Sequence, residues 1–183
     1  VTVDLKNNKI DVHSYRYEPW QISLIDTGLE TQTGGRLKRL KKYLKGEESF
    51  LFTYGDGLAD INLDLLFKKH LENNTLATVT AVAPPGRYGA LTYEGDRVIG
   101  FQEKPDGDGG MINGGFFILN PKVIDLIEND FINWEEQPLS RLAEENNLYA
   151  YRHQGFWHPM DTLRDKNYLE SLWIKGNAPW KKW

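Results

Sequence analysis

The order of apolar and polar positions predicts alternating strands and helices in the first half of the chain. Apolar or β-rich runs at 21–27, 48–54 and 77–83 predict three strands, and the middle run is typical of a buried strand with parallel pairing. Residues 36–45 and 60–74 carry apolar side chains at helical spacing. The face of the second helix expected to point inward consists of Leu63, Leu66, Phe67 and Leu71. This order predicts right-handed βαβ crossovers and a parallel sheet, hence an α/β fold.

The pattern changes after residue 84. Two β-rich runs, 88–93 and 98–103, flank Glu94-Gly95-Asp96 and predict a hairpin. A further strand is expected at 111–119, where a pair of glycines indicates a bulge or a close approach of backbone. The remaining elements expected are helices at 121–128, 138–145 and 161–175 and an edge strand at 148–153.

Composition limits the classes of protein that the chain can represent. Its 183 residues, 40% of them apolar, suffice for one domain with a sizeable core. The net charge of −4 argues against a general nucleic-acid binder. No window reaches the roughly 20 apolar residues of a membrane-spanning helix. The chain has no cysteine, which excludes disulfides and Cys-based zinc sites and is compatible with a reducing cytoplasm. We therefore expect a cytoplasmic domain whose partners are neither nucleic acids nor membranes.

Asp56 is the leading candidate for a chemical role, because it follows the expected strand directly and is flanked by Gly55 and Gly57. An acid at the carboxyl edge of an open α/β sheet lies where such sheets bind ligands, and glycine lets a ligand approach the backbone. Carboxylate and phosphate oxygens are the ligands that Mg²⁺ prefers. The alternative is a turn and helix cap with no chemical role. The residue pattern leaves both interpretations open.

Two further segments could add groups to such a site. Asp161 would be a second metal carboxylate at the start of the last helix, although a cap is favoured there by residue type. Glu103 could accept sugar hydroxyls and Lys104 could hold a phosphate, although an exposed turn is favoured. His153 and His158 are not expected to be ligands.

Glycine pairs mark two more candidate positions. Asn113, just before Gly114, could hydrogen-bond a substrate hydroxyl, and an ordinary bulge is equally consistent with the sequence. Two glycines at 34–35 would free the N-terminal amides of the first helix for an anion, with Arg36 as a charge-assisted donor. The basic residues at 38–45 are expected to form a solvated helix face.

In this order the segments resemble the sugar nucleotidyltransferase (nucleotide-sugar pyrophosphorylase) family over about residues 20–183. The segments that carry the resemblance are Thr-Gly-Gly-Arg-Leu-Lys-Arg, Phe-Leu-Phe-Thr-Tyr-Gly-Asp-Gly, Pro-Pro-Gly-Arg-Tyr-Gly-Ala-Leu, Phe-Gln-Glu-Lys-Pro, Ile-Asn-Gly-Gly-Phe-Phe and Trp-His-Pro-Met-Asp-Thr-Leu-Arg-Asp. The first two, and a C-terminal Pro-Trp-Lys, point to the branch that transfers a cytidylyl group. The resemblance implies a Rossmann-like mixed, mostly parallel sheet flanked by helices, with an added small β hairpin region and a C-terminal helix.

The resemblance also implies a reaction. CTP and α-D-glucose 1-phosphate would give CDP-glucose and pyrophosphate by Mg²⁺-dependent, in-line displacement at the α-phosphorus. The resemblance implies that this CDP-glucose would be a precursor of 3,6-dideoxyhexoses in the O-antigen of bacterial lipopolysaccharide. A homo-oligomer is implied as well.

The residue roles implied are of three kinds. The metal carboxylates would be Asp56 and Asp161. The catalytic set would be Arg36, Asp56, Lys104 and Asp161. The substrate contacts would come from Thr31, Arg36, Gly55, Glu103, Lys104, Asn113 and Gly114.

The sequence departs from the family at one point. The family's Gly-Gly-x-Gly-Thr-Arg-Leu loop, which cradles the triphosphate with backbone amides, is absent, as is its Pro-Lys-Pro segment. We therefore expect residues 1–183 to be a single nucleotidyltransferase domain that lacks the N-terminal βαβ unit and has weak or absent turnover alone. One alternative is a catalytically incomplete fragment that binds nucleotide-sugars or oligomerises, using Trp173, Trp180 and Trp183. The other is a metal-dependent glycosyltransferase, whose usual Asp-x-Asp is missing.

Overall fold

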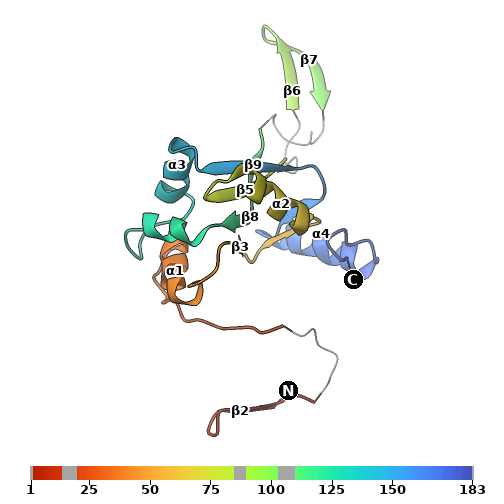
Figure 1. Cartoon of the computed structure of the whole chain (residues 1–183). Helices are drawn as coiled ribbons and strands as arrows, with labels where there is room; N and C mark the ends of the chain where they lie inside the picture. Colours follow the sequence, from red (N-terminus) through yellow and green to blue (C-terminus); the bar gives the residue numbers. More distant parts are fainter. Residues whose placement is uncertain (1, 14–19, 85–89, 103–109, 183) are drawn as a thin grey trace.

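The centre of the fold is a mixed four-stranded sheet, seen in a computed structural model that describes residues 2–13, 20–84, 90–102 and 110–182 (Figure 1). The strand order is β3 (Phe50–Thr53), β8 (Ile112–Leu119), β5 (Ala77–Val82) and β9 (Leu148–His153). β8 runs antiparallel to both of its neighbours, and β5 runs parallel to β9. Three of the four strands share one direction, although only the β5–β9 pairing is parallel, and the expected mixed sheet is confirmed.

Helices cover both faces of this sheet. On one face, α1 (Thr33–Arg39), the 3₁₀ helix η2 (Pro121–Leu126) and α3 (Gln137–Glu144) pack on a core built around Phe117 and Trp134, both fully buried. On the other face, α2 (Leu63–Asn73) packs on β5, where His70 Nδ1 lies 2.9 Å from Thr78 Oγ1. A 3₁₀ turn, η1 (Lys41–Tyr43), follows α1, and α4 (Leu163–Ile174) lies near the C-terminus. None of the described helices combines the length and apolar character that crossing a membrane requires.

The core reaches the end of β3 through a chain of aromatic rings. Phe117 contacts Trp134 edge to face with 6.0 Å between ring centroids, and Tyr54 contacts Phe52 and Phe117 at 5.9 and 6.0 Å. Edge-to-face pairs of this kind stabilise a core beyond the area that they bury. The ring of Tyr54 is thus fixed just beyond the last residue of β3.

Two expectations about the first strands are wrong. β3 alternates half-buried and exposed residues, and within the described residues it pairs only with β8, antiparallel, so it is an edge strand. Residues 21–27 form no strand, and Ile22 and Leu24 are 72% and 93% exposed. A strand needs a hydrogen-bonding neighbour, and no described strand pairs with this segment.

The face of α2 that is buried is also narrower than expected. Only Leu66 and His70 are buried, whereas Leu63, Phe67 and Leu71 are between 42% and 59% exposed. Residues four apart form one line along a helix, and this single line of α2 meets the sheet.

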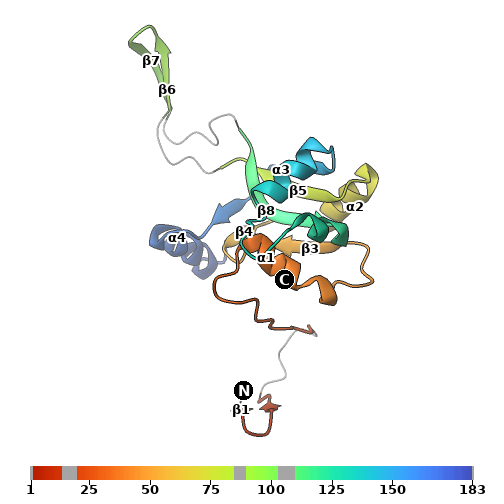
Figure 2. The same ribbon diagram turned by 90° about the vertical axis from the view of Figure 1, so that its left-hand side faces the viewer.

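Three two-stranded units lie outside the main sheet. The hairpin of β6 (Ala90–Glu94) and β7 (Arg97–Gln102) is present as expected, and it extends away from the sheet in both views (Figure 2). A second hairpin, β1 (Thr2–Asp4) with β2 (Lys9–Asp11), was not anticipated. Neither was the pairing of β4 (Gly57–Ala59) with β10 (Trp157–Pro159), which joins distant parts of the chain.

Candidate functional site

An open pocket of about 450 Å³ lies where the chain leaves β3. Its lining residues come from helix α1, from the turn after β3 and from the loop before α3: Thr33, Tyr54, Gly55, Asp56 and Glu135. Among the described residues, no atom would lie within 4 Å of a Cβ added to Gly55, so no described side chain covers this part of the backbone. The pocket is therefore at the strand end where the sequence predicts a ligand.

The β4–β10 pairing brings together the two backbone segments that carry the predicted metal carboxylates. Gly57 lies opposite Pro159, and beyond this pair the Met160 amide donates a 2.8 Å hydrogen bond to the carbonyl oxygen of Asp56. Asp161 is the next residue, so two acids 105 positions apart in sequence lie on adjacent backbone, and both are exposed.

Other residues cap the helices that follow the two acids. The N-cap of α2 is Asn62, whose side chain accepts from the amide of Leu65. The N-cap of α4 is Thr162, which forms a reciprocal capping box with Asp165. The hydrogen bond from Thr162 keeps the pKa of Asp165 below its usual value. Capping therefore does not explain Asp56 or Asp161.

Two exposed acids just outside the paired strands β4 and β10 suit a hard divalent cation that keeps substrate oxygens or water in its coordination shell. Among the described residues, no group of three or more His, Asp or Glu side chains could hold a metal alone. A cation here would therefore depend on ligand oxygens as well as on Asp56 and Asp161.

Glu135 is a pocket residue that the sequence analysis missed. Its carboxylate accepts hydrogen bonds from the hydroxyls of Tyr54, at 2.5 Å, and Thr33, at 2.7 Å. Burial, followed by the hydrogen bond to Glu135, raises the pKa of Tyr54 far above its ordinary value, so the phenol stays a proton donor. No local pattern distinguishes Glu135 from the adjacent Glu136, because its partners are 81 and 102 positions away.

Asn113 joins this network from β8. Its Nδ2 donates to the Tyr54 hydroxyl at 3.3 Å, and its Oδ1 accepts from the Gly115 amide at 2.8 Å. Gly115 has φ +80°, and a Cβ there would lie 2.6 Å from Cδ2 of Tyr54. A Cβ on Gly114 would lie 2.7 Å from Val82 Cγ1. The glycine pair therefore allows Tyr54 and β5 to pack closely against β8.

The glycines of α1 have a different role from the one expected. A Cβ on Gly35 would lie 2.4 Å from the carbonyl oxygen of Asp130, and the Gly35 amide donates to Ile132 O at 3.2 Å. The expectation that this amide is free for an anion is wrong, because the helix packs directly against residues 130–134.

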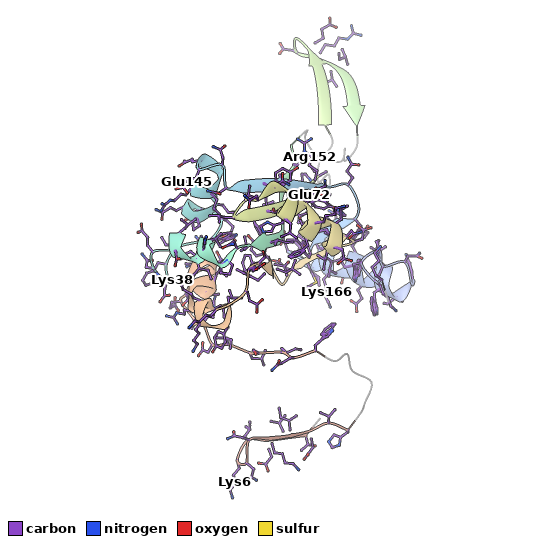
Figure 3. All side chains as sticks on the ribbon, in the orientation of Figure 1. Lys6, Lys38, Glu72, Glu145, Arg152 and Lys166 are labelled. Atoms are coloured by element: carbon purple, nitrogen blue, oxygen red, sulfur yellow. The ribbon has the colours of Figure 1, made fainter. Side chains whose placement is uncertain are left out.

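The basic residues of α1 and η1 bind protein groups. Lys38, labelled in Figure 3, donates to the carbonyl oxygens of Ile127 and Glu128 at 2.7 and 2.6 Å. Arg39 forms a two-point ion pair with Asp130, and Lys41 pairs with Asp125. Most of this basic face is exposed as expected, and three of its residues also bind groups of η2 and of the loop that follows it.

The remaining predicted site residues are less directly connected to the pocket. Arg36 donates to Thr27 Oγ1 at 2.7 Å and to Leu29 O at 3.1 Å, and it is not among the lining residues. Thr31 is buried in the loop before α1. Glu103 and Lys104 lie outside the described residues.

The histidines contact protein groups, in keeping with the expectation that they are not ligands. His153 Nε2 lies 3.0 Å from Asp60 Oδ1, and His158 Nε2 lies 3.3 Å from Asp165 Oδ1. In the tail, the ring of Trp180 packs on Phe156 of the same chain, with centroids 5.4 Å apart.

Comparison with known proteins places the chain in a family. The family model for nucleotidyl transferases matches residues 8–164, and the chain belongs to this family. It is 56% identical over 183 residues to a glucose-1-phosphate cytidylyltransferase of Salmonella typhi, covering 100% of this chain and 71% of that protein. A Bacillus subtilis protein to which the same activity is ascribed is 42% identical over 167 residues, which cover 91% of this chain and 65% of that protein.

A solved structure supports the fold. A Bacillus anthracis protein described as a glucose-1-phosphate thymidylyltransferase superposes with a TM-score of 0.60 at 13% identity, covering 85% of this chain and 65% of that one. At this identity the similarity concerns the fold alone.

Proposed function

We propose that the protein is a glucose-1-phosphate cytidylyltransferase, which converts CTP and α-D-glucose 1-phosphate to CDP-glucose and pyrophosphate with Mg²⁺. The observation that carries this proposal is the β4–β10 pairing, which sets Asp161 on backbone adjacent to that of the pocket residue Asp56. The similarity to the Salmonella protein extends over the whole chain and supports the choice of substrates.

The chemistry requires positioning and charge neutralisation more than acid–base catalysis. An ionised phosphate oxygen of glucose 1-phosphate forms the new bond to the α-phosphorus, and the bond from that phosphorus to the pyrophosphate oxygen breaks in line. No proton has to be removed from the nucleophile, which fits histidines that contact protein groups instead. A bound Mg²⁺ supplies charge neutralisation on the phosphates, and Asp56 and Asp161 would hold it.

The other groups divide between the two substrates. Asn113 and Glu103 bind hexose hydroxyls, Lys104 binds the sugar phosphate, and the backbone at Gly55 and Gly114 contacts the nucleotide-sugar. Thr31 contacts the substrate, and Arg36 acts on the nucleotide side from the helix that also carries the pocket residue Thr33.

The proposal extends to the organisation of the protein. Residues 1–183 form a single domain, and binding of the triphosphate also needs the family's Gly-rich loop, a segment that these residues do not contain. We further place the enzyme in the cytoplasm as a homo-oligomer that supplies CDP-glucose for O-antigen lipopolysaccharide.

The test is a pyrophosphate-release assay with CTP, glucose 1-phosphate and Mg²⁺, in which CDP-glucose is followed by chromatography. Because residues 1–183 do not contain the Gly-rich loop, we expect slow turnover that gives equal amounts of both products and stops in the presence of EDTA. Mg²⁺-dependent binding of CDP-glucose without any turnover would favour the binding-fragment alternative. Consumption of CDP-glucose only when a sugar acceptor is added would favour a glycosyltransferase.

A further inference from the structure

A carboxylate in the wall of the pocket is bound to two hydroxyls and through one of them reaches a third side chain. We propose that Glu135 is a positioning residue which, through Tyr54, fixes the amide of Asn113 and thereby sets the preference of the site for glucose among hexose 1-phosphates. This inference rests on the proposed function, in which Asn113 binds a hexose hydroxyl.

The direction of each hydrogen bond in the network follows from its chemistry. An ionised carboxylate can only accept, so Tyr54 and Thr33 both donate to Glu135. Tyr54 has a single proton, so its oxygen can only accept on the side of Asn113. Asn113 therefore turns its NH₂ group toward Tyr54, which leaves its carbonyl oxygen for the amide of Gly115. The hydrogen bond to Tyr54 and the one from Gly115 therefore each assign the orientation of the Asn113 amide, and they give the same orientation.

The groups around Glu135 are held by packing as well as by hydrogen bonds. The Tyr54 ring is fixed edge to face against Phe52 and Phe117. Thr33 Oγ1 also accepts from the Trp134 amide at 2.9 Å, so the hydroxyl that binds Glu135 has a fixed position. A carboxylate anchored at both oxygens by such groups holds one orientation, as a preorganised site requires.

The link to specificity lies in the second N–H of Asn113. One N–H of the planar amide points to Tyr54, so the direction of the other N–H is fixed as well. The Asn113 side chain is exposed, so an incoming ligand can reach this second N–H. A site that presents a fixed donor to one hydroxyl discriminates against an epimer in which that hydroxyl is displaced, because the donor is then left unpaired.

The experiment compares Glu135→Gln with the unsubstituted chain in steady-state assays with glucose, mannose and galactose 1-phosphates. The glutamine keeps the shape of the side chain but presents a donor to one hydroxyl, which weakens the bond that orients Tyr54. We expect KM for glucose 1-phosphate to rise about tenfold and the preference for glucose over its epimers to fall about tenfold, with kcat and KM for CTP within about twofold.

Two further variants make the result specific. Tyr54→Phe keeps the ring and removes the hydroxyl, so it should reproduce the loss of preference. Glu136→Gln is the matched control, because Glu136 is the adjacent exposed acid and does not line the pocket. In ¹⁵N NMR spectra of the ligand-free chain, Glu135→Gln should shift the side-chain amide of Asn113, and Glu136→Gln should not.

The outcomes separate the inference from the function on which it rests. An active chain in which Glu135→Gln leaves the preference unchanged, or lowers activity equally for all hexoses, overturns the inference and leaves the function standing. A chain that binds CDP-glucose without turnover, and binds it less tightly after Glu135→Gln with the Asn113 amide shifted, contradicts the transferase proposal and supports the positioning role. A chain that neither turns over nor binds a hexose phosphate contradicts both.

Discussion

Replacing Gly115 by alanine tests the packing that seats Tyr54 at the pocket. The residue has φ +80°, and the added Cβ would lie 2.6 Å from Cδ2 and 3.1 Å from Cε2 of Tyr54. The backbone conformation costs an L-residue about 1–2 kcal/mol. Crowding a ring that is packed on two other rings costs about 1–3 kcal/mol more. We therefore expect the free energy of unfolding to fall by about 2–5 kcal/mol.

The assay is urea denaturation followed by tryptophan fluorescence, with Gly46→Ala as the matched control. Gly46 has φ +94° but no atom within 4 Å of an added Cβ, so its substitution measures the backbone cost alone. The difference between the two variants isolates the contact with Tyr54 and should be at least about 1 kcal/mol. Equal losses in the two variants would refute the argument that Gly115 is required by the Tyr54 ring.

Three more predictions concern the elements around the pocket. Thr162→Ala removes the capping box of α4 and should cost about 1 kcal/mol of unfolding free energy, measured by urea denaturation; an unchanged midpoint would contradict the cap. Gly35→Ala should cost about 3 kcal/mol, because its Cβ would lie 2.4 Å from a backbone oxygen of Asp130, and a loss below about 1 kcal/mol would show that α1 does not pack this closely. The pKa of Tyr54 is raised in the folded state, so above about pH 10 the unfolded chain loses this proton first and stability falls. Tyr54→Phe should lessen that alkaline loss of stability, measured by denaturation at pH 8 to 11. The same pH dependence in both proteins would contradict the claim that Tyr54 is a buried proton donor.

The sequence predicts the main body of the fold well, because long periodic segments determine their own structure. β5, β8, β9 and the β6–β7 hairpin lie close to the expected ranges. The β4–β10 pairing could not be predicted, since three-residue strands carry no periodic pattern and their pairing depends on distant residues. The strand expected at 21–27 is wrong, because this run has the composition of a strand but no described strand pairs with it.

In the candidate site, too, some residues could be predicted from the sequence and others could not. Turn residues and family resemblance predict a role for Asp56 and Asp161, and the structure adds that their backbone segments lie side by side. Glu135 was missed, because its role arises from contacts with Tyr54 and Thr33 that only the folded chain creates. The glycines of α1 were misread, because a sequence cannot distinguish a glycine that exposes an amide from one that permits close packing.

The central claim is that Asp56 and Asp161 hold one divalent cation together, and Mn²⁺ binding measured by EPR in the presence of CDP-glucose tests it most directly. We expect one ion per chain, loss of that ion in both Asp56→Asn and Asp161→Asn, no further loss in the double variant, and melting temperatures close to that of the unsubstituted chain. Asp96→Asn, in the exposed turn between β6 and β7, should bind normally. Retention of the ion in either single variant, or losses that add as for two separate ions, would contradict the claim.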